Sequence, residues 1–173
     1  MDLQMVIVGL GGDGIIFMTR VLVEGLYRSG HPVISTETHG MAMRGGSVIS
    51  QVKIGDYQSP LIRYGEADIL VGTSAVEAQR NSPLLKNGGT VITNANGQGD
   101  QCVDATGIAH RLGNPRGSNL VLLGFALARL GPSTPMKPFL DAIKDLSPQR
   151  FLSANLNAFK AGWRESSRAV RVT

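Results

Sequence analysis

Apolar residues at the start of the chain come in short runs that are separated by glycines. Residues 5–8 form an unbroken run ending at Gly9, as is typical of a strand buried on both faces of a parallel sheet. Apolar positions then recur at helical spacing from residue 15 to residue 26, and a second strand-like run occupies residues 33–36. The order strand, glycine loop, helix and strand is the signature of a right-handed parallel crossover.

The pattern changes to alternation between residues 47 and 54, with Val48, Ser50, Val52 and Ile54 on one face, which predicts a strand. A Gly-Asp turn leads from it into residues 57–62, so this region predicts an antiparallel hairpin or an edge insertion. Ser74 and Glu77 have the spacing of a capping box and predict the start of a helix. Later apolar runs predict further strands at residues 68–72, 90–93 and 102–103.

The last third of the chain has the spacing of helices. A short helix is expected around residues 107–112, and three longer ones begin where a capping residue precedes proline, at residues 114–115, 134–135 and 147–148. Together these elements predict an α/β domain of three layers, Rossmann-like, with a mostly parallel sheet, helices on both faces and a β-hairpin insertion. We expect residues 1–173 to form this single domain.

Composition excludes several classes of protein. The chain has 42% hydrophobic and 17% charged residues, which is not the balance of a disordered protein. Its longest apolar run, residues 120–128, is too short to span a bilayer, and no basic signal segment opens the chain. We therefore expect a soluble, cytoplasmic protein with no membrane contact.

The charge is only mildly basic, with 17 Lys and Arg against 13 Asp and Glu. These positive charges are spread along the chain, except for Arg164, Arg168 and Arg171, which we interpret as a solvated end of the chain. Nucleic-acid binding is therefore a minor alternative. The single cysteine, Cys102, cannot form an internal disulfide or hold an iron–sulfur cluster, and the three histidines lack metal-ligand spacing.

The first glycine loop allows two interpretations. Residues 9–14 fit the pattern G-x-G-x-x-G between a strand and a helix, and Glu37 stands where a ribose-binding acid would be expected. These features support a stand-alone oxidoreductase that binds a dinucleotide such as NAD or FAD. Asp13 weakens this hypothesis, because its carboxylate would repel a pyrophosphate while stabilising the helix start without any ligand.

A second glycine-rich segment, residues 38–47, contains Arg44, whose guanidinium could pair with a carboxylate or a phosphate. Taken with residues 11–14, this segment resembles the gamma-type domain of 2-oxoacid:ferredoxin oxidoreductases, and most of all the small beta subunit of the indolepyruvate type. Family members usually carry glutamine at the position of Asp13. Further similar stretches are residues 59–62, 65–68, 85–91, 113–115, 119–124 and 150–162.

The resemblance implies a role within an oxidoreductase complex. Such enzymes decarboxylate a 2-oxoacid, such as indolepyruvate or pyruvate, with coenzyme A and pass the electrons to ferredoxin. A large partner subunit would hold thiamine diphosphate and iron–sulfur clusters. This chain would be an accessory subunit with no catalytic residue and no metal of its own, and the isolated chain would be free to form a homodimer. The residues carried over as interface or cleft loops, near a coenzyme A or substrate entrance, are Gly11, Gly12, Gly14, Arg44, Gly45 and Gly46.

Overall fold

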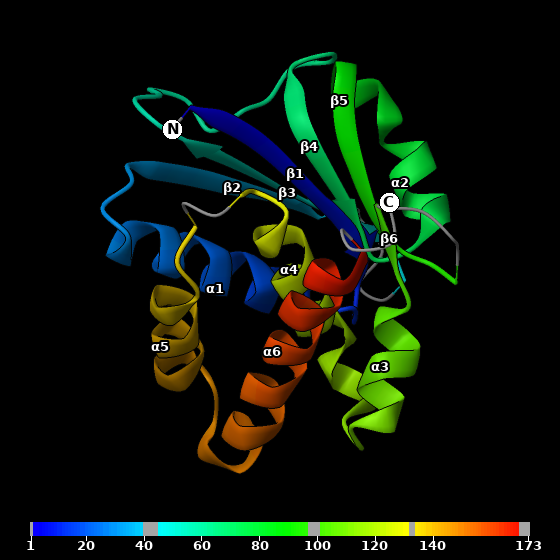
Figure 1. Ribbon diagram of the computed structural model, residues 1–173. Coiled ribbons are helices and arrows are strands. Elements are labelled where there is room, and N and C mark those ends of the chain that lie inside the picture. Colours follow the sequence, from blue (N-terminus) through cyan, green and yellow to red (C-terminus); the bar gives the residue numbers. More distant parts are fainter. Residues whose placement is uncertain (1, 40–44, 97–100, 132–133, 170–173) are drawn as a thin grey trace.

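The fold is built on a six-stranded sheet with helices on both faces (Figure 1). The computed structural model describes residues 2–39, 45–96, 101–131 and 134–169. The strands are β1 (Leu3–Leu10), β2 (Val33–His39), β3 (Ser47–Ile54), β4 (Ala67–Gly72), β5 (Leu85–Asn94) and β6 (Cys102–Val103). The helices are α1 (Ile15–Arg28), α2 (Ala75–Arg80), α3 (Ala105–Arg111), α4 (Ser118–Ala128), α5 (Met136–Leu146) and α6 (Leu152–Ala169), with 3-10 turns η1 (Ser82–Leu84), η2 (Pro115–Gly117) and η3 (Gln149–Phe151).

The strands lie in the order β2-β3-β1-β4-β5-β6. β1, β4, β5 and β6 are parallel neighbours, whereas β3 is antiparallel to both β1 and β2. The prediction of a mostly parallel sheet within an α/β fold is confirmed.

The predicted hairpin between residues 47–54 and 57–62 is wrong in its second strand. In β3, Val48, Val52 and Ile54 are buried on one face as expected, but Gln51 and Lys53 on the other face are buried too, because the strand pairs with β1 and β2 inside the sheet. Residues 57–62 are not a strand. The N–H of Ile62 donates to the side-chain oxygen of Gln51 at 2.5 Å, so a side chain takes the place of a strand ladder there.

The crossover from β1 through α1 to β2 also differs from the simple expectation. β2 runs parallel to β1, but β3 lies between the two strands. Glu37 is therefore opposite Ser50 of β3, and Ser50 in turn is opposite Ile7 of β1. Neighbouring strands are about 4.8 Å apart, so Glu37 is two strand spacings from β1 and does not stand beside the glycine loop as it would in a dinucleotide fold.

The two faces of the sheet are covered unequally. The larger apolar cluster lies on the face of α1 and α4, and it includes Phe125, Phe139 and Phe159 from three different helices. In Figure 1, α5 and α6 form a further layer on this side. A smaller cluster that contains Val6, Leu70 and Ala78 lies on the opposite face, where α2 packs. Among the described residues, no helix combines the length and apolar character needed to cross a membrane.

Backbone contact between α4 and α6 holds the helical layer together. Gly124 and Gly162 face the opposite helix, and a Cβ atom added at Gly162 would overlap the carbonyl oxygen of Val121. A Cβ atom at Gly124 would overlap the carbonyl oxygen of Phe159. The two glycines thus set how closely the helices approach.

Candidate functional site

The candidate site is the cleft at the carboxyl end of the sheet, between the loops that follow β1 and β4. The chain leaves β1 toward α1 on one face and leaves β4 toward α2 on the other, so this is a topological switch point, where open α/β sheets bind ligands. A cavity of about 250 Å³ opens there. Its polar lining comes from Asp13, Thr73, Ser74, Asn94, Thr106, Ser118 and Asn119.

Asp13 ties the β1 loop to the end of β4. Its carboxylate accepts hydrogen bonds from the Leu10 N–H at 2.9 Å and from the Thr73 hydroxyl at 2.6 Å. Asn94 continues the network from the end of β5, because its amide donates to the Thr73 carbonyl oxygen at 3.1 Å and to the Thr106 hydroxyl at 2.8 Å. One line of polar contacts therefore links the ends of β1, β4 and β5 to the start of α3.

Three N–H groups of the glycine loop that a pyrophosphate cradle would leave free are bound within the protein. The Leu10 N–H is bound to Asp13, the Gly11 N–H donates to the Gly46 carbonyl oxygen at 2.8 Å, and the Asp13 N–H donates to Leu10 at 3.0 Å. A dinucleotide site needs such groups to point at the phosphates. With Glu37 also displaced from the loop, the geometry gives the stand-alone dinucleotide enzyme no support.

The predicted site residues come together in part. The Gly11–Gly46 hydrogen bond joins the two glycine-rich segments, and Gly11, Gly12 and Gly45 lie exposed on the surface. Gly14 faces inward instead, where its φ of 77° and the amide of Asn119, donating to its carbonyl oxygen at 3.1 Å, leave no room for a side chain. Arg44 lies outside the described residues.

Glu77 has a role that the sequence did not reveal, because its spacing from Ser74 predicted only a helix capping box. Ser74 does cap α2 by accepting from the Glu77 N–H at 3.3 Å, but the Glu77 carboxylate does not complete the box. It is almost fully buried, accepts a hydrogen bond from the Ser47 hydroxyl, and pairs with Arg80 at 2.6 Å. Glu77 therefore anchors Ser47, which is both the last residue of the second glycine-rich segment and the first residue of β3.

Comparison with known proteins is consistent with this arrangement. Residues 4–165 match the model of the family described as pyruvate ferredoxin/flavodoxin oxidoreductase. The chain belongs to this family. It is 28% identical to the indolepyruvate oxidoreductase subunit IorB of Archaeoglobus fulgidus, over 96% of each chain.

Solved structures of similar fold include subunits and whole enzymes. The gamma subunit of keto/oxoacid ferredoxin oxidoreductase from Geobacter sulfurreducens superposes with a TM-score of 0.78, at 22% identity, over 96% of this chain and 99% of that one. The 2-oxoglutarate:ferredoxin oxidoreductase of Magnetococcus marinus gives the same TM-score at 21% identity. The superposition covers 97% of this chain but only 31% of the Magnetococcus chain, so this fold is one part of that longer polypeptide.

The described residues offer few ligands for the cofactors that the oxidoreductase family implies. Within the described ranges, no three His, Cys, Asp or Glu side chains gather as metal ligands. Cys102 is partly buried and lies 3.4 Å from the Thr93 hydroxyl. An iron–sulfur cluster needs several thiolates, so this chain does not fit that group. The cleft lining consists of hydroxyls, amides, one carboxylate and two leucines, which offer hydrogen bonds to a polar molecule.

Proposed function

We propose that the chain is the accessory, gamma-type subunit of a 2-oxoacid:ferredoxin oxidoreductase and contributes no catalytic group of its own. The match to the oxidoreductase family over residues 4–165 carries this proposal. A large partner subunit would supply thiamine diphosphate and the iron–sulfur clusters, because one cysteine cannot hold a cluster. Indolepyruvate is the first substrate to test, since an archaeal relative is named for it.

The partner's docking face is the surface around the two joined glycine segments. Gly11, Gly12 and Gly45 expose backbone without side chains, and the side chains of Leu10 and Ile16 beside them are 38% and 44% exposed. Exposed apolar residues next to bare backbone allow close approach of another chain. Without its partner, the same face would favour a homodimer.

The cleft next to this face would border the entrance for coenzyme A or the 2-oxoacid. Its hydroxyl and amide groups offer hydrogen bonds to a polar molecule, and Asp13 and Asn94 hold its walls in place. The Magnetococcus enzyme is described with 2-oxoglutarate, coenzyme A and succinyl-CoA bound. In the complex, the cleft would therefore shape access to chemistry performed by the partner.

Anaerobic reconstitution with the large subunit from the same source tests this function. The pair should oxidise indolepyruvate or another 2-oxoacid with coenzyme A and reduce ferredoxin, and ferredoxin reduction can be followed by its visible absorbance. Neither chain alone should do so at a comparable rate. Full activity of the large subunit alone, or no association between the chains, would contradict the accessory role.

Gly11→Leu tests the docking face. A Cβ at Gly11 has only ordinary contacts with Gly45 and Gly46, so the variant should fold, but its side chain would stand in the interface. We expect weaker association with the large subunit and an unchanged Tm. Ser153→Leu places the same side chain on the exposed side of α6 and should associate normally.

For Arg44, the sequence resemblance predicts that Arg44→Ala lowers the turnover of the assembled enzyme.

A further inference from the structure

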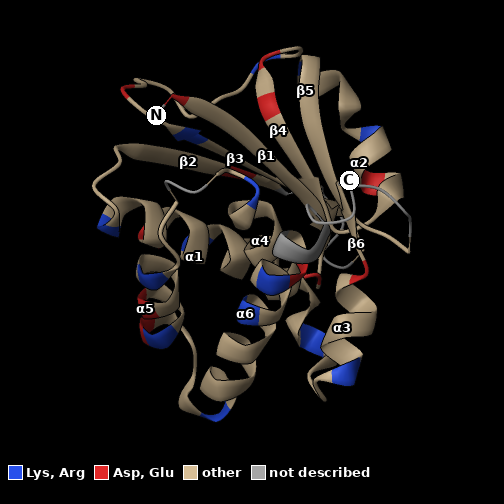
Figure 2. Cartoon of the chain, viewed as in Figure 1, with Lys and Arg blue, Asp and Glu red and all other residues tan. Residues whose placement is uncertain are grey.

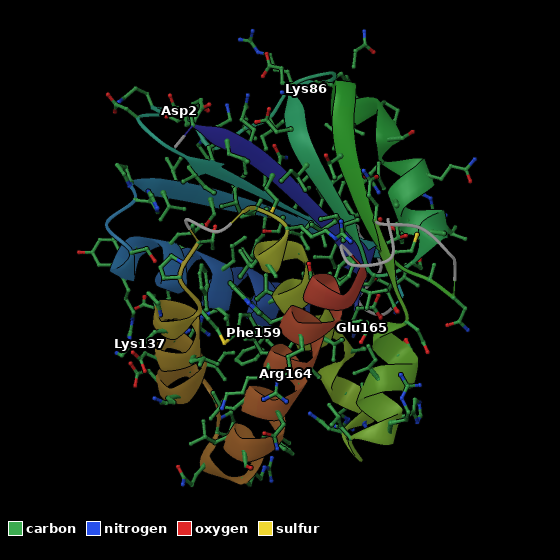
Figure 3. All side chains as sticks on the ribbon, viewed as in Figure 1. Asp2, Lys86, Lys137, Phe159, Arg164 and Glu165 are labelled. Atoms are coloured by element: carbon green, nitrogen blue, oxygen red, sulfur yellow. The ribbon has the colours of Figure 1, made fainter. Side chains whose placement is uncertain are left out.

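A groove between α3 and α6 lies apart from the cleft. It has a volume of about 230 Å³ and shares no lining residue with the candidate site. Figure 3 shows Arg164 and Glu165 on the late turns of α6. The lining consists of Ile108, Arg111, Leu112, Ala161, Arg164 and Glu165.

The groove combines an apolar floor with arginines. Ile108 and Ala161 line it from the two helices, and Leu112, just after α3, leaves 44% of its surface exposed. Arg111 and Arg164 come from opposite walls. A bound segment could therefore place an apolar side chain on Leu112 while the guanidinium groups reach its polar neighbours.

The positive charges around this groove are poorly neutralised. The nearest carboxylate oxygen of Asp104 is 3.7 Å from Arg111, too far for a hydrogen bond, and Asp104 already caps α3 by accepting from Gly107 at 2.7 Å. Among the described residues, Arg164 has no ion-pair partner, nor has Arg116 on η2, which packs against both α3 and α6. Glu165 has an interaction of its own.

The surface of α5 shows that this is not a general property of the chain. There Lys137 and Lys144 both bind Asp141 at 2.8 Å, and Asp145 binds Arg28 at 2.7 Å. In Figure 2, blue and red segments alternate on α5, whereas blue ones prevail along α6 and at the lower end of α3. Positive charge is therefore less balanced by carboxylates along α6 and α3 than on α5.

We propose that the groove between α3 and α6 binds an acidic segment of a partner protein, with its carboxylates on Arg111 and Arg164 and an apolar residue on Leu112. Guanidinium groups bind carboxylates through paired, charge-assisted hydrogen bonds, and arginines beside apolar residues are typical of interface centres. Nucleic acid fits less well, because none of the described residues that line the groove is aromatic and could stack on a base. This inference does not depend on the proposed function.

Fluorescence anisotropy with the purified full chain tests the groove. The probe is a fluorescein-labelled peptide, Glu-Glu-Leu-Glu-Glu-Leu-Glu-Glu, titrated at low ionic strength. Arg111→Glu/Arg164→Glu should raise its Kd by about tenfold or more, since two attractive contacts become repulsive. Lys137→Glu/Lys144→Glu changes the net charge equally on α5 and should leave the Kd within about twofold. Circular dichroism and Tm of both variants check that they are folded.

Further variants and competing ligands test whether the groove prefers the peptide over other anions. Leu112→Ser should weaken peptide binding without changing charge, and Arg111→Lys/Arg164→Lys should keep only part of it, because lysine lacks the planar fork of arginine. The inference is overturned if the wild-type chain does not bind the peptide, or if the two charge-reversal pairs lose binding equally. Displacement of the peptide by inorganic phosphate at low millimolar concentration, or tighter binding of labelled oligothymidine, would also overturn it.

Discussion

Between α4 and α6 the two helix backbones touch, whereas at the carboxyl end of the sheet polar side chains make several of the contacts between elements. Gly124 and Gly162 make the first contact possible by having no side chain. Asp13, Asn94 and Glu77 make the second through hydrogen bonds to Thr73, Thr106 and Ser47.

The difference separates stability from function. Packed interiors do not easily accommodate an added methyl group, while single polar contacts near water contribute modestly. The α4–α6 contact should therefore govern the free energy of unfolding, and the polar contacts should govern the shape of the cleft. Three substitutions test this division, from the largest expected effect to the smallest, and a fourth on the surface of α5 provides a reference outside both regions.

Gly162→Ala should destabilise the fold most. An alanine would normally favour a helix by about 1 kcal/mol over glycine. Here its methyl group would overlap the Val121 carbonyl oxygen on α4, so the sign reverses. We expect a loss of about 2–3 kcal/mol in the free energy of unfolding, and a Tm lower by roughly 5–10 °C.

Urea denaturation measures the first value and calorimetry the second. Asn157→Ala, at an exposed position of the same helix, is the matched control and should not destabilise. A Gly162→Ala protein as stable as the wild type would mean that the two backbones are not in contact.

Glu77→Ala should have an intermediate effect. It removes a buried carboxylate that accepts from the Ser47 hydroxyl and from Arg80. We expect a cost of about 1–2 kcal/mol, and faster amide hydrogen exchange at Ser47 and at Gly11. Glu24→Ala, which breaks only an exposed pair with Arg28, should change neither. Exchange at Ser47 as slow as in the wild type would exclude the anchoring role of Glu77.

Asp13→Ala should cost less, up to about 1 kcal/mol, because the lost hydrogen bonds to Leu10 and Thr73 are exposed to water. Asp13→Asn should recover most of this loss, since its side-chain oxygen still accepts both bonds. Urea denaturation of the two variants provides the measurement. A full loss in the Asn variant would show that the charge, rather than the hydrogen bonds, holds the loop.

Asp141→Asn should have the smallest effect, and only at certain pH values. Hydrogen bonds from Lys137 and Lys144 lower the pKa of Asp141 from 3.8 to about 2. Because the pKa is lower in the folded state, the carboxylate stabilises the fold above pH 3.8 and loses this contribution as the pH falls through 2. The Tm difference between wild type and variant should therefore shrink over that interval and with added salt. A difference that grew on acidification would contradict the sign.

The sequence predicted the positions of the strands and helices better than it predicted which strands pair with one another. Periodicity identified the face of β3 that carries Val48, Val52 and Ile54, but it missed that Gln51 and Lys53 on the other face are buried as well. It could not place β3 between β1 and β2, because pairing partners are not encoded in alternation. Residues 57–62 looked like a strand, yet Leu61 is 60% exposed and Ile62 is bound by a side chain.

The candidate site was predicted in outline. Both glycine segments were visible, because glycine runs between strands and helices are rare without a reason. The hydrogen bond from Gly11 to Gly46 was not, since the two residues are brought together only by β3. The contact of Glu77 with Ser47 was not predicted either, because the spacing of Glu77 from Ser74 already fitted a helix cap. The nearness of Arg111 to Arg164 likewise depends on how α3 packs against α6.

The position of β1 has a consequence for the order in which the chain can fold. β1 is made first on the ribosome, but its two neighbours in the sheet are β3, which ends at Ile54, and β4, which ends at Gly72. A strand with apolar residues on both faces therefore has no partner until β3 is complete, 44 residues after Leu10, and lacks its second partner until β4 ends, 62 residues after Leu10. During synthesis, its apolar run at residues 5–8 is the segment most in need of protection from other chains.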